Sequence, residues 1–254
     1  MNVIDRCWRP NPEWRRHRSQ LAACSVGYAG KMINNMGDDL IHYKVIDSSD
    51  DPINPKPKTL RKGDSIRSCR WDAIRLVTAS KIWIDHNTLH DCQDGLLDVT
   101  RGSTNVTISN NWFKNQDKVM LLGHDDGYVR DKNMKVTVVY NHFGPNCNQL
   151  CQANNLYQGW LQYAIGGSMK PSLKSEANIF VAPTGNKVIW RKNSDKNEDR
   201  WDFYSIRDTF ENGASLTVTK GENVPKPNYN KEQNFEVVDA KFIKLVTRSS
   251  DVLR

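Results

Sequence analysis

The sequence predicts an all-β protein, a right-handed parallel β-helix with a short N-terminal helix and a loop-rich C-terminal segment. The main observation is a phrase that recurs between residues 81 and 182: apolar, any, apolar, two of any kind, Asn, any, apolar or aromatic. Its copies are Ile82, Ile84, Asn87, Leu89; Val106, Ile108, Asn111, Phe113; Val136, Val138, Asn141, Phe143; Leu150, Gln152, Asn155, Tyr157; and Leu173, Ser175, Asn178, Phe180. Successive asparagines are 24, 30, 14 and 23 residues apart. Three of these steps fit one coil of a repeat protein, whose periods run from about 20 to 50 residues.

The second observation is the spacing inside each phrase. Apolar residues at every second position predict a strand with one buried face. The asparagine that follows suits a bend, and asparagines stacked in register can hydrogen-bond along the solenoid axis. The consensus of leucine-rich repeats is absent, so stacked parallel strands are the predicted architecture.

Composition limits the partners. The chain has 254 residues, a mean hydropathy of −0.68, a net charge of +7 and a pI near 9.0. This balance indicates either a solvated basic surface or attraction to a polyanion such as an acidic polysaccharide. No dense Lys/Arg run with interleaved aromatic residues occurs, so we expect no nucleic-acid partner.

Membrane and redox signals are weak. No run of 18 apolar residues occurs, and the first residues contain no apolar core of a signal peptide, so we expect neither a membrane span nor a leader in this chain. Cys7 and Cys24 flank a helical stretch and can form a disulfide, which would need an oxidising compartment. Unpaired buried thiols are the equal alternative.

Outside the repeats the predicted elements are fewer. Residues 11–25 are expected to form a helix, and residues 42–46 a strand before a proline-rich loop. Residues 201–210 and 214–219 are expected to add a flap and a strand, and residues 235–253 a packed helix. The predicted organisation is an N-terminal segment, residues 1–61, shortened β-helix coils, residues 62–183, and a C-terminal flap and packing segment, residues 184–254.

Three aspartates near the predicted repeat strands form a candidate metal site. Asp94 and Asp98 fall between two repeat strands, and Asp72 precedes the strand of the neighbouring coil. Three converging carboxylates would suit Ca²⁺, which takes about six to eight oxygen ligands. The alternative is three unrelated turn aspartates. Lys118, one coil further on, is either a surface lysine or a group that meets an anionic ligand.

Asp85 and His86 form a second candidate, a His–carboxylate pair for general-base chemistry. Neighbours on a strand point to opposite faces, so a structural histidine is the preferred interpretation.

Taken together, several motifs resemble the plant pectate lyase family, and the similarity reaches both ends of the chain. The motifs are residues 5–8, 54–61, 82–87, 94–98, 102–104, 107–111, 118–125, 131–134, 141–143, 163–168 and 212–214. The resemblance implies a pectate lyase-like solenoid and a secreted, cell-wall enzyme that cleaves de-esterified pectin, a (1→4)-α-D-galacturonan, by Ca²⁺-dependent β-elimination. It assigns Asp72, Asp94 and Asp98 as Ca²⁺ ligands and Lys118 as a ligand of the substrate carboxylate. In that family an arginine is the base.

The chain also departs from the family pattern. The family carries an Arg-Met-Pro-Arg-x-Arg-x-Gly segment between its Asn-His-Phe and Asn-Asn-x-Tyr motifs. Here Phe143 is followed closely by Asn154, and no arginine occurs between Arg130 and Arg191. The 14-residue step is this deletion, and the catalytic residue is therefore unknown. Trp71 replaces a family glycine before Asp72, and Arg70 stands where an acidic residue is expected.

Three hypotheses follow. The chain is a Ca²⁺-dependent pectate lyase, although general-base help is worth about 10²–10⁴-fold and its base is missing. Alternatively it is a non-catalytic β-helix that binds polygalacturonate. The third hypothesis is a non-functional truncated product whose exposed strand edges promote association. For the first two we expect pectin as the partner and a monomer.

Overall fold

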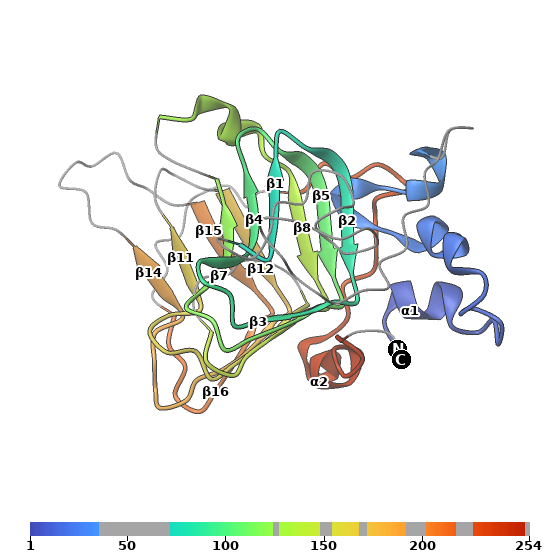
Figure 1. Cartoon of the computed structure of the whole chain (residues 1–254). Coiled ribbons are helices and arrows are strands. Elements are labelled where there is room, and N and C mark those ends of the chain that lie inside the picture. Colours follow the sequence, from blue (N-terminus) through green and yellow to red (C-terminus); the bar gives the residue numbers. More distant parts are fainter. Residues whose placement is uncertain are drawn as a thin grey trace.

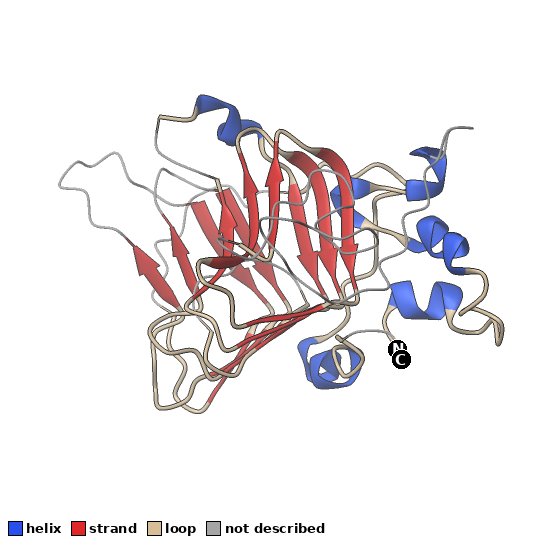
Figure 2. Cartoon of the chain, viewed as in Figure 1, coloured by secondary structure: helices blue, strands red, loops and turns tan. Residues whose placement is uncertain are grey.

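The computed structural model describes residues 1–35, 72–123, 127–147, 154–167, 172–191, 202–216 and 226–251. Parallel strands wind into stacked coils, and short helices gather around the two chain ends (Figures 1 and 2). Every strand pair in these ranges is parallel. The predicted all-β parallel β-helix is therefore confirmed.

Each coil contributes strands to separate sheets. The first three coils contain β1 (Ile74–Val77), β2 (Ser80–Asp85) and β3 (Thr88–His90); β4 (Gly95–Thr100), β5 (Thr104–Ser109) and β6 (Trp112–Lys114); and β7 (Lys118–Leu122), β8 (Val136–Val139) and β9 (His142–Phe143). The later coils contain β10 (Leu156–Gln158); β11 (Ile165–Gly167), β12 (Ser172–Glu176) and β13 (Ile179–Val181); and β14 (Ile189–Arg191), β15 (Asp202–Ile206) and β16 (Thr209–Glu211).

The coils extend past residue 183, the boundary that the sequence predicts. Strands β14, β15 and β16 pair in parallel with β11, β12 and β13. The segment expected to be a flap, residues 201–210, is thus largely one more coil of the solenoid. Asp208 explains why the repeat was missed here, because it takes the place of the asparagine.

The asparagine ladder forms as predicted. Each rung accepts a backbone N–H from the rung before it: Asn87 donates to Asn111 at 2.9 Å, Asn111 to Asn141 at 2.9 Å, Asn141 to Asn155 at 2.9 Å, Asn155 to Asn178 at 2.7 Å and Asn178 to Asp208 at 2.8 Å. The residue before each rung has a positive φ, between 51° and 59°, which turns the chain at the corner. The side-chain amides thus satisfy backbone groups that would otherwise be buried without partners.

An aromatic stack runs beside the ladder. Its members are the last residues of the repeated phrase, and neighbouring rings are stacked with centroids 4.6–5.5 Å apart: Phe113, Phe143, Tyr157, Phe180 and Phe210. The first four are at most 1% exposed. Stacked rings of this kind stabilise the core beyond the area they bury.

The 14-residue step leaves a clear structural trace. Strand β10 pairs directly with β9, so the sheet of order β16-β13-β10-β9-β6-β3 is continuous across the step. Among the described residues, the other faces of the solenoid divide at this point: β1-β4-β7 is separate from β11-β14, and β2-β5-β8 from β12-β15. Among the described residues, this coil contributes its asparagine corner and its third strand, β10, to the continuous sheet. Leu150 and Gln152 of the fourth phrase lie outside the described residues.

The N-terminal region differs from its prediction. The α-helix α1 is Val3–Trp8, and a 3₁₀ helix at Arg18–Cys24 replaces the second half of the expected helix at residues 11–25. Further 3₁₀ helices are Gly27–Ala29 and Met32–Asn35. Cys7 and Cys24 form a disulfide, which decides between the two alternatives for this pair. This bond fastens α1 to the following segment, whose residues Val26 and Ala29 hydrogen-bond to Thr107 on β5.

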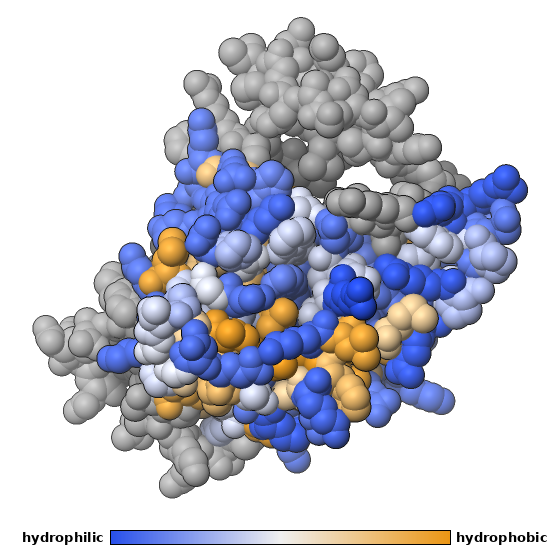
Figure 3. Space-filling view, turned by 90° about the horizontal axis from the view of Figure 1, so that it is seen from below, coloured by the Kyte–Doolittle hydropathy of each residue, from blue (hydrophilic) through white to orange (hydrophobic). Residues whose placement is uncertain are grey.

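The C-terminal segment packs near α1 (Figure 1), where the Asn2 side chain donates to the Val246 carbonyl and Ser249 donates to Asp5. It contains a 3₁₀ helix, Ala240–Phe242, and α2, Ile243–Val246, in agreement with the expected packed helix. A further 3₁₀ helix, Val129–Asn133, follows β7. The lower face of the molecule is mainly hydrophilic with apolar residues along its middle (Figure 3).

Two predicted elements cannot be compared with the structure. The strand at residues 42–46 and the proline-rich loop at residues 48–58 lie outside the described residues. Within the described ranges, no helix has the length and apolarity needed to cross a membrane.

Candidate functional site

The sheet of order β1-β4-β7 carries all four residues that the sequence singled out. Strand register brings them together: Arg75 on β1 is opposite Asp98 on β4, and Gly95 on β4 is opposite Lys118 on β7. Asp72 lies two residues before β1, and Asp94 immediately precedes β4. Stacking of successive coils thus converts sequence separations of more than twenty residues into neighbouring positions on one sheet.

Asp72 and Asp98 converge at Gly95. The Gly95 N–H donates to Asp72 Oδ1 over 2.9 Å. A Cβ built on Gly95 would be 2.8 Å from Asp72 Oδ1 and 2.8 Å from Asp98 Oδ1, so both oxygens approach the same point. Only a residue without a side chain leaves this space free. Both aspartates are buried, with 2% of Asp72 and 8% of Asp98 exposed.

Arg75 is a described cation within ion-pair distance of this pair. Its Nε lies 3.8 Å from Asp72 Oδ2, which is longer than a hydrogen bond. The same Nε is buried and makes no hydrogen bond. No sequence motif includes Arg75, because the residue lies within a short strand.

Asp94 is turned away from the pair and toward Lys118. Lys118 Nζ donates to Asp94 Oδ1 over 2.7 Å, and both side chains are exposed. Gln116 fixes the turn before β4: it accepts from the backbone N–H of Cys92 over 2.8 Å and donates to the carbonyl of Asp94. The lysine is therefore beside the carboxylates, as the site hypothesis requires, with one of them as its partner.

Among the described residues, three carboxylates and two cations determine the electrostatics of the site. Burial raises the pKa of Asp98 to about 7, and the neighbouring Asp72 and Asp94 carboxylates act in the same direction, whereas Arg75 and Lys118 oppose them. The hydrogen bond to Asp94 raises the pKa of Lys118. Charge that is buried with only partial compensation favours a bound proton or a bound cation.

The donor set suits a hard cation. Carboxylate oxygens are the ligands that Ca²⁺ prefers, and two of them meet at the free space over Gly95. In the parts of the chain that the structure describes, no three His, Cys, Asp or Glu side chains are grouped closely enough to form a complete metal site. Asp72 and Asp98 thus provide a partial site, and Asp94 would have to leave Lys118 to join it.

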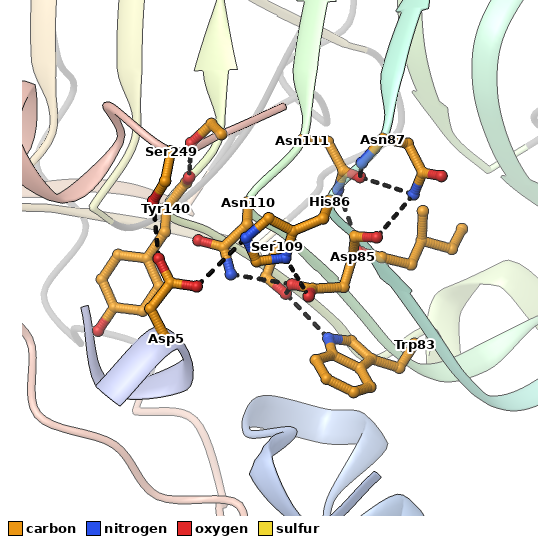
Figure 4. Close-up of polar contacts among 12 residues, drawn as sticks. Asp5, Trp83, Asp85, His86, Asn87, Ser109, Asn110, Asn111, Tyr140 and Ser249 are labelled. Atoms are coloured by element: carbon orange, nitrogen blue, oxygen red, sulfur yellow. Dashed lines mark hydrogen bonds and ion pairs between the residues drawn. The ribbon is translucent and has the colours of Figure 1, made fainter. Parts of the chain in front are cut away.

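The second candidate, Asp85 and His86, has a different character. His86 Nδ1 lies 2.5 Å from Asp85 Oδ2, and His86 Nε2 lies 3.2 Å from Asp5 Oδ1 (Figure 4). The expectation that the two neighbours point to opposite faces is wrong, because His86 follows β2 with a φ of 53° that turns its ring back toward Asp85. The imidazole is 2% exposed.

The surroundings of His86 are closed by polar side chains from distant segments. Asp85 Oδ1 accepts from Ser109 and from Asn110, and Asp5 Oδ2 accepts from Ser249 (Figure 4). Burial would lower the pKa of His86, but the contacts with Asp5 and Asp85 raise it to about 9. An enclosed imidazole that is charged at neutral pH suits an anchor between the chain ends and the solenoid, in agreement with the structural interpretation.

Comparison with known proteins identifies relatives of this chain. A family model described as pectate lyase matches residues 53–221. Pectate lyase 1 of Juniperus virginiana is 33% identical over 347 aligned residues, which cover 99% of this chain and 94% of that protein. The chain belongs to the pectate lyase family.

Other pectate lyases support the assignment. Pectate lyase 1 of Cryptomeria japonica is 34% identical, with 99% of this chain and 92% of that protein covered. The crystal structure of Jun a 1, the major allergen from cedar pollen, superposes with a TM-score of 0.85 at 32% identity and covers 100% of both chains. A pectate lyase from Bacillus sp. N165 in complex with trigalacturonate shares the fold, with a TM-score of 0.59 over 71% of this chain and 62% of that chain, at 23% identity.

This chain is shorter than its pectate lyase relatives. The alignment with the Juniperus protein has 347 positions, whereas the chain has 254 residues, so the relative contains stretches that are missing here. The division of two solenoid faces beside β10 is a place in the fold where a coil is reduced. No arginine occurs in the sequence between Arg130 and Arg191, which spans this place.

Proposed function

We propose that this protein acts on polygalacturonate, the de-esterified part of pectin, by Ca²⁺-dependent β-elimination. The observation that carries the proposal is the acidic cluster on the β1-β4-β7 sheet, where Asp72 and Asp98 converge over Gly95 and Lys118 lies beside Asp94. Family membership supplies the reaction class, and a trigalacturonate complex of a Bacillus relative is in keeping with the substrate.

Each residue of the cluster has a role in this proposal. Asp72 and Asp98 hold the cation, and Asp94 joins them when a substrate carboxylate takes its place beside Lys118. The exposed ammonium of Lys118 then orients the uronate on the sheet. A bound Ca²⁺ would neutralise the uronate carboxylate and acidify its C5 proton, which is a Lewis-acid effect.

The proton acceptor is the weak point of the enzymatic proposal. In β-elimination a base removes the C5 proton while the C4 oxygen leaves, and the family arginine for this step has no counterpart between Arg130 and Arg191. This absence favours a second candidate function, in which the protein binds polygalacturonate without rapid cleavage. Both functions use the same cation and the same lysine.

Location and assembly follow from the same proposal. The Cys7–Cys24 disulfide favours an oxidising compartment, and we propose the cell wall, where pectin is found. The net charge of +7 would attract a polyuronate. We further propose that the protein acts as a monomer, because the side chains of β8, at the reduced coil, are all buried.

An ultraviolet assay for the unsaturated uronate product tests the proposal. Polygalacturonate is supplied with Ca²⁺ or with EDTA, and oligogalacturonate binding is measured in parallel by calorimetry. EDTA-sensitive product formation supports the lyase, and Ca²⁺-dependent binding without product supports the non-catalytic alternative. Neither binding nor product in saturating Ca²⁺ would overturn both.

A further inference from the structure

Arg75 is the one charged residue of the acidic cluster that has no role in the proposed function. It projects from β1 at the position opposite Asp98 on β4. Its Nε also lies 3.8 Å from Asp72 Oδ2, so Arg75 is next to both buried carboxylates.

The contact of Arg75 with its carboxylate is looser than a direct hydrogen bond. Arg207 Nη2 lies 2.7 Å from Glu176 Oε1, which is a direct hydrogen bond. Arg75 Nε lies 3.8 Å from Asp72 Oδ2 and is buried without a hydrogen-bond partner, as is Arg9 Nε at 3.5 Å from Asp5 Oδ1. Arg75 Nε is therefore close enough to Asp72 for charge attraction, but it lacks the charge-assisted hydrogen bond that holds an ion pair tightly.

Charge balance explains why Arg75 remains there. Asp72 and Asp98 are almost completely buried, and Lys118 is occupied by Asp94. Two carboxylates that face the same point need a positive charge nearby, and Arg75 lies within ion-pair distance of Asp72. Its side chain is 33% exposed, so the guanidinium has a path to solvent.

We propose that Arg75 is the resident counter-cation of the Asp72–Asp98 pair and is displaced when a divalent cation enters. The inference rests on the proposed Ca²⁺ site and deepens it, because it makes cation affinity a competition within the protein. A positive charge beside the site weakens the binding of a second positive charge by Coulomb repulsion. Arg75 thereby sets the Ca²⁺ concentration at which the site fills.

Calcium titration by calorimetry tests this inference. Arg75→Met keeps an unbranched apolar side chain and removes the charge. Arg207→Met is the matched control, because it removes an equal charge from the ion pair of Arg207 with Glu176, outside the acidic cluster. We expect Arg75→Met to bind Ca²⁺ about tenfold more tightly than the wild type. Arg207→Met should bind within about twofold of the wild type, because solvent screens distant charges.

Arg75→Lys retains the charge and provides a second variant in case Arg75→Met folds poorly. A lysine should leave Ca²⁺ affinity within about threefold of the wild type, because charge and not guanidinium shape is the active property. Equal Ca²⁺ affinity in the wild type and Arg75→Met, or weaker binding by Arg75→Met, would overturn the inference alone. No Ca²⁺ binding by any of these folded proteins would overturn the proposed Ca²⁺ dependence, and the inference with it.

Discussion

Two clusters of buried charge in this solenoid have opposite designs. The anchor of Asp5, Asp85 and His86 places one histidine between two carboxylates, one of which comes from the distant N-terminal segment (Figure 4). The cluster of Asp72 and Asp98 has two carboxylates at one point and an arginine at a longer ion-pair distance. A cation enclosed between two carboxylates stabilises a fold, whereas two carboxylates that face the same point favour the binding of a cation. The comparison therefore separates a structural histidine from a functional aspartate pair.

The largest expected effect is on the anchor. Replacing His86 by alanine leaves Asp5 and Asp85 buried without their shared cation, which should lower the free energy of unfolding by about 3–5 kcal/mol. Chemical denaturation measures this. His90→Ala is the matched control, because the His90–Asp91 pair is exposed and should change stability by less than about 1 kcal/mol. Equal losses in the two variants would contradict the assignment of His86 as the anchor.

The pH dependence of unfolding should identify the same residue. The pKa of His86 in the folded protein is about 9, above its usual value of 6.5. A raised pKa means that the stabilisation is fully present below about pH 6.5 and is lost as the pH rises through about 9. We expect the free energy of unfolding to fall by about 3 kcal/mol across this window in the wild type. Denaturation curves of His86→Ala should lack this fall; the same fall in the variant would assign it to another group.

At the acidic cluster, ionisation of the titrating group should lower the free energy of unfolding, which is the opposite of its effect at His86. The pKa of Asp98 is raised to about 7 by burial and by the Asp72 carboxylate, so ionised Asp98 costs stability. This cost is absent below about pH 4 and complete above about pH 7. In EDTA, Asp98→Asn should therefore be more stable than the wild type by about 2 kcal/mol at pH 8 and by much less at pH 4. Denaturation at both values tests this, and an advantage that is equal at both would refute the titration of Asp98 as its cause.

A smaller effect is expected at Gly95. Alanine would place its Cβ 2.8 Å from an oxygen of each aspartate, so the carboxylates must move apart. We expect a loss of about 1–2 kcal/mol in unfolding free energy and Ca²⁺ binding at least about tenfold weaker. The same substitution made in an Asp98→Ala background should cost less, because one of the two colliding oxygens is gone. A full cost in that background would place the collision elsewhere.

The sequence predicted the solenoid because its signal is periodic. Each asparagine follows a strand at fixed spacing, and the same hydrogen bond recurs at every rung. The sequence pattern did not include Asp208, because a carboxylate accepts the hydrogen bond there in place of an asparagine amide. The four candidate residues could be placed on one sheet once the coils were counted.

What the sequence could not provide was side-chain direction. The orientation of His86 depends on a single backbone conformation, and the position of Arg75 opposite Asp98 depends on strand register between coils. The disulfide of Cys7 with Cys24 needed the fold of the N-terminal segment to decide between pairing and free thiols. These features arise from three-dimensional packing and have no local sequence signal.

The central claim is that Asp72 and Asp98 form a cation site while the anchor of His86 does not. Calorimetric titration of Ca²⁺ into the wild type, Asp98→Asn and Asp91→Asn tests it most directly, since Asp91 is an exposed aspartate outside the cluster. The account predicts saturable binding to the wild type and to Asp91→Asn, and a loss of at least about tenfold in affinity in Asp98→Asn. Equal Ca²⁺ binding by all three proteins would contradict it.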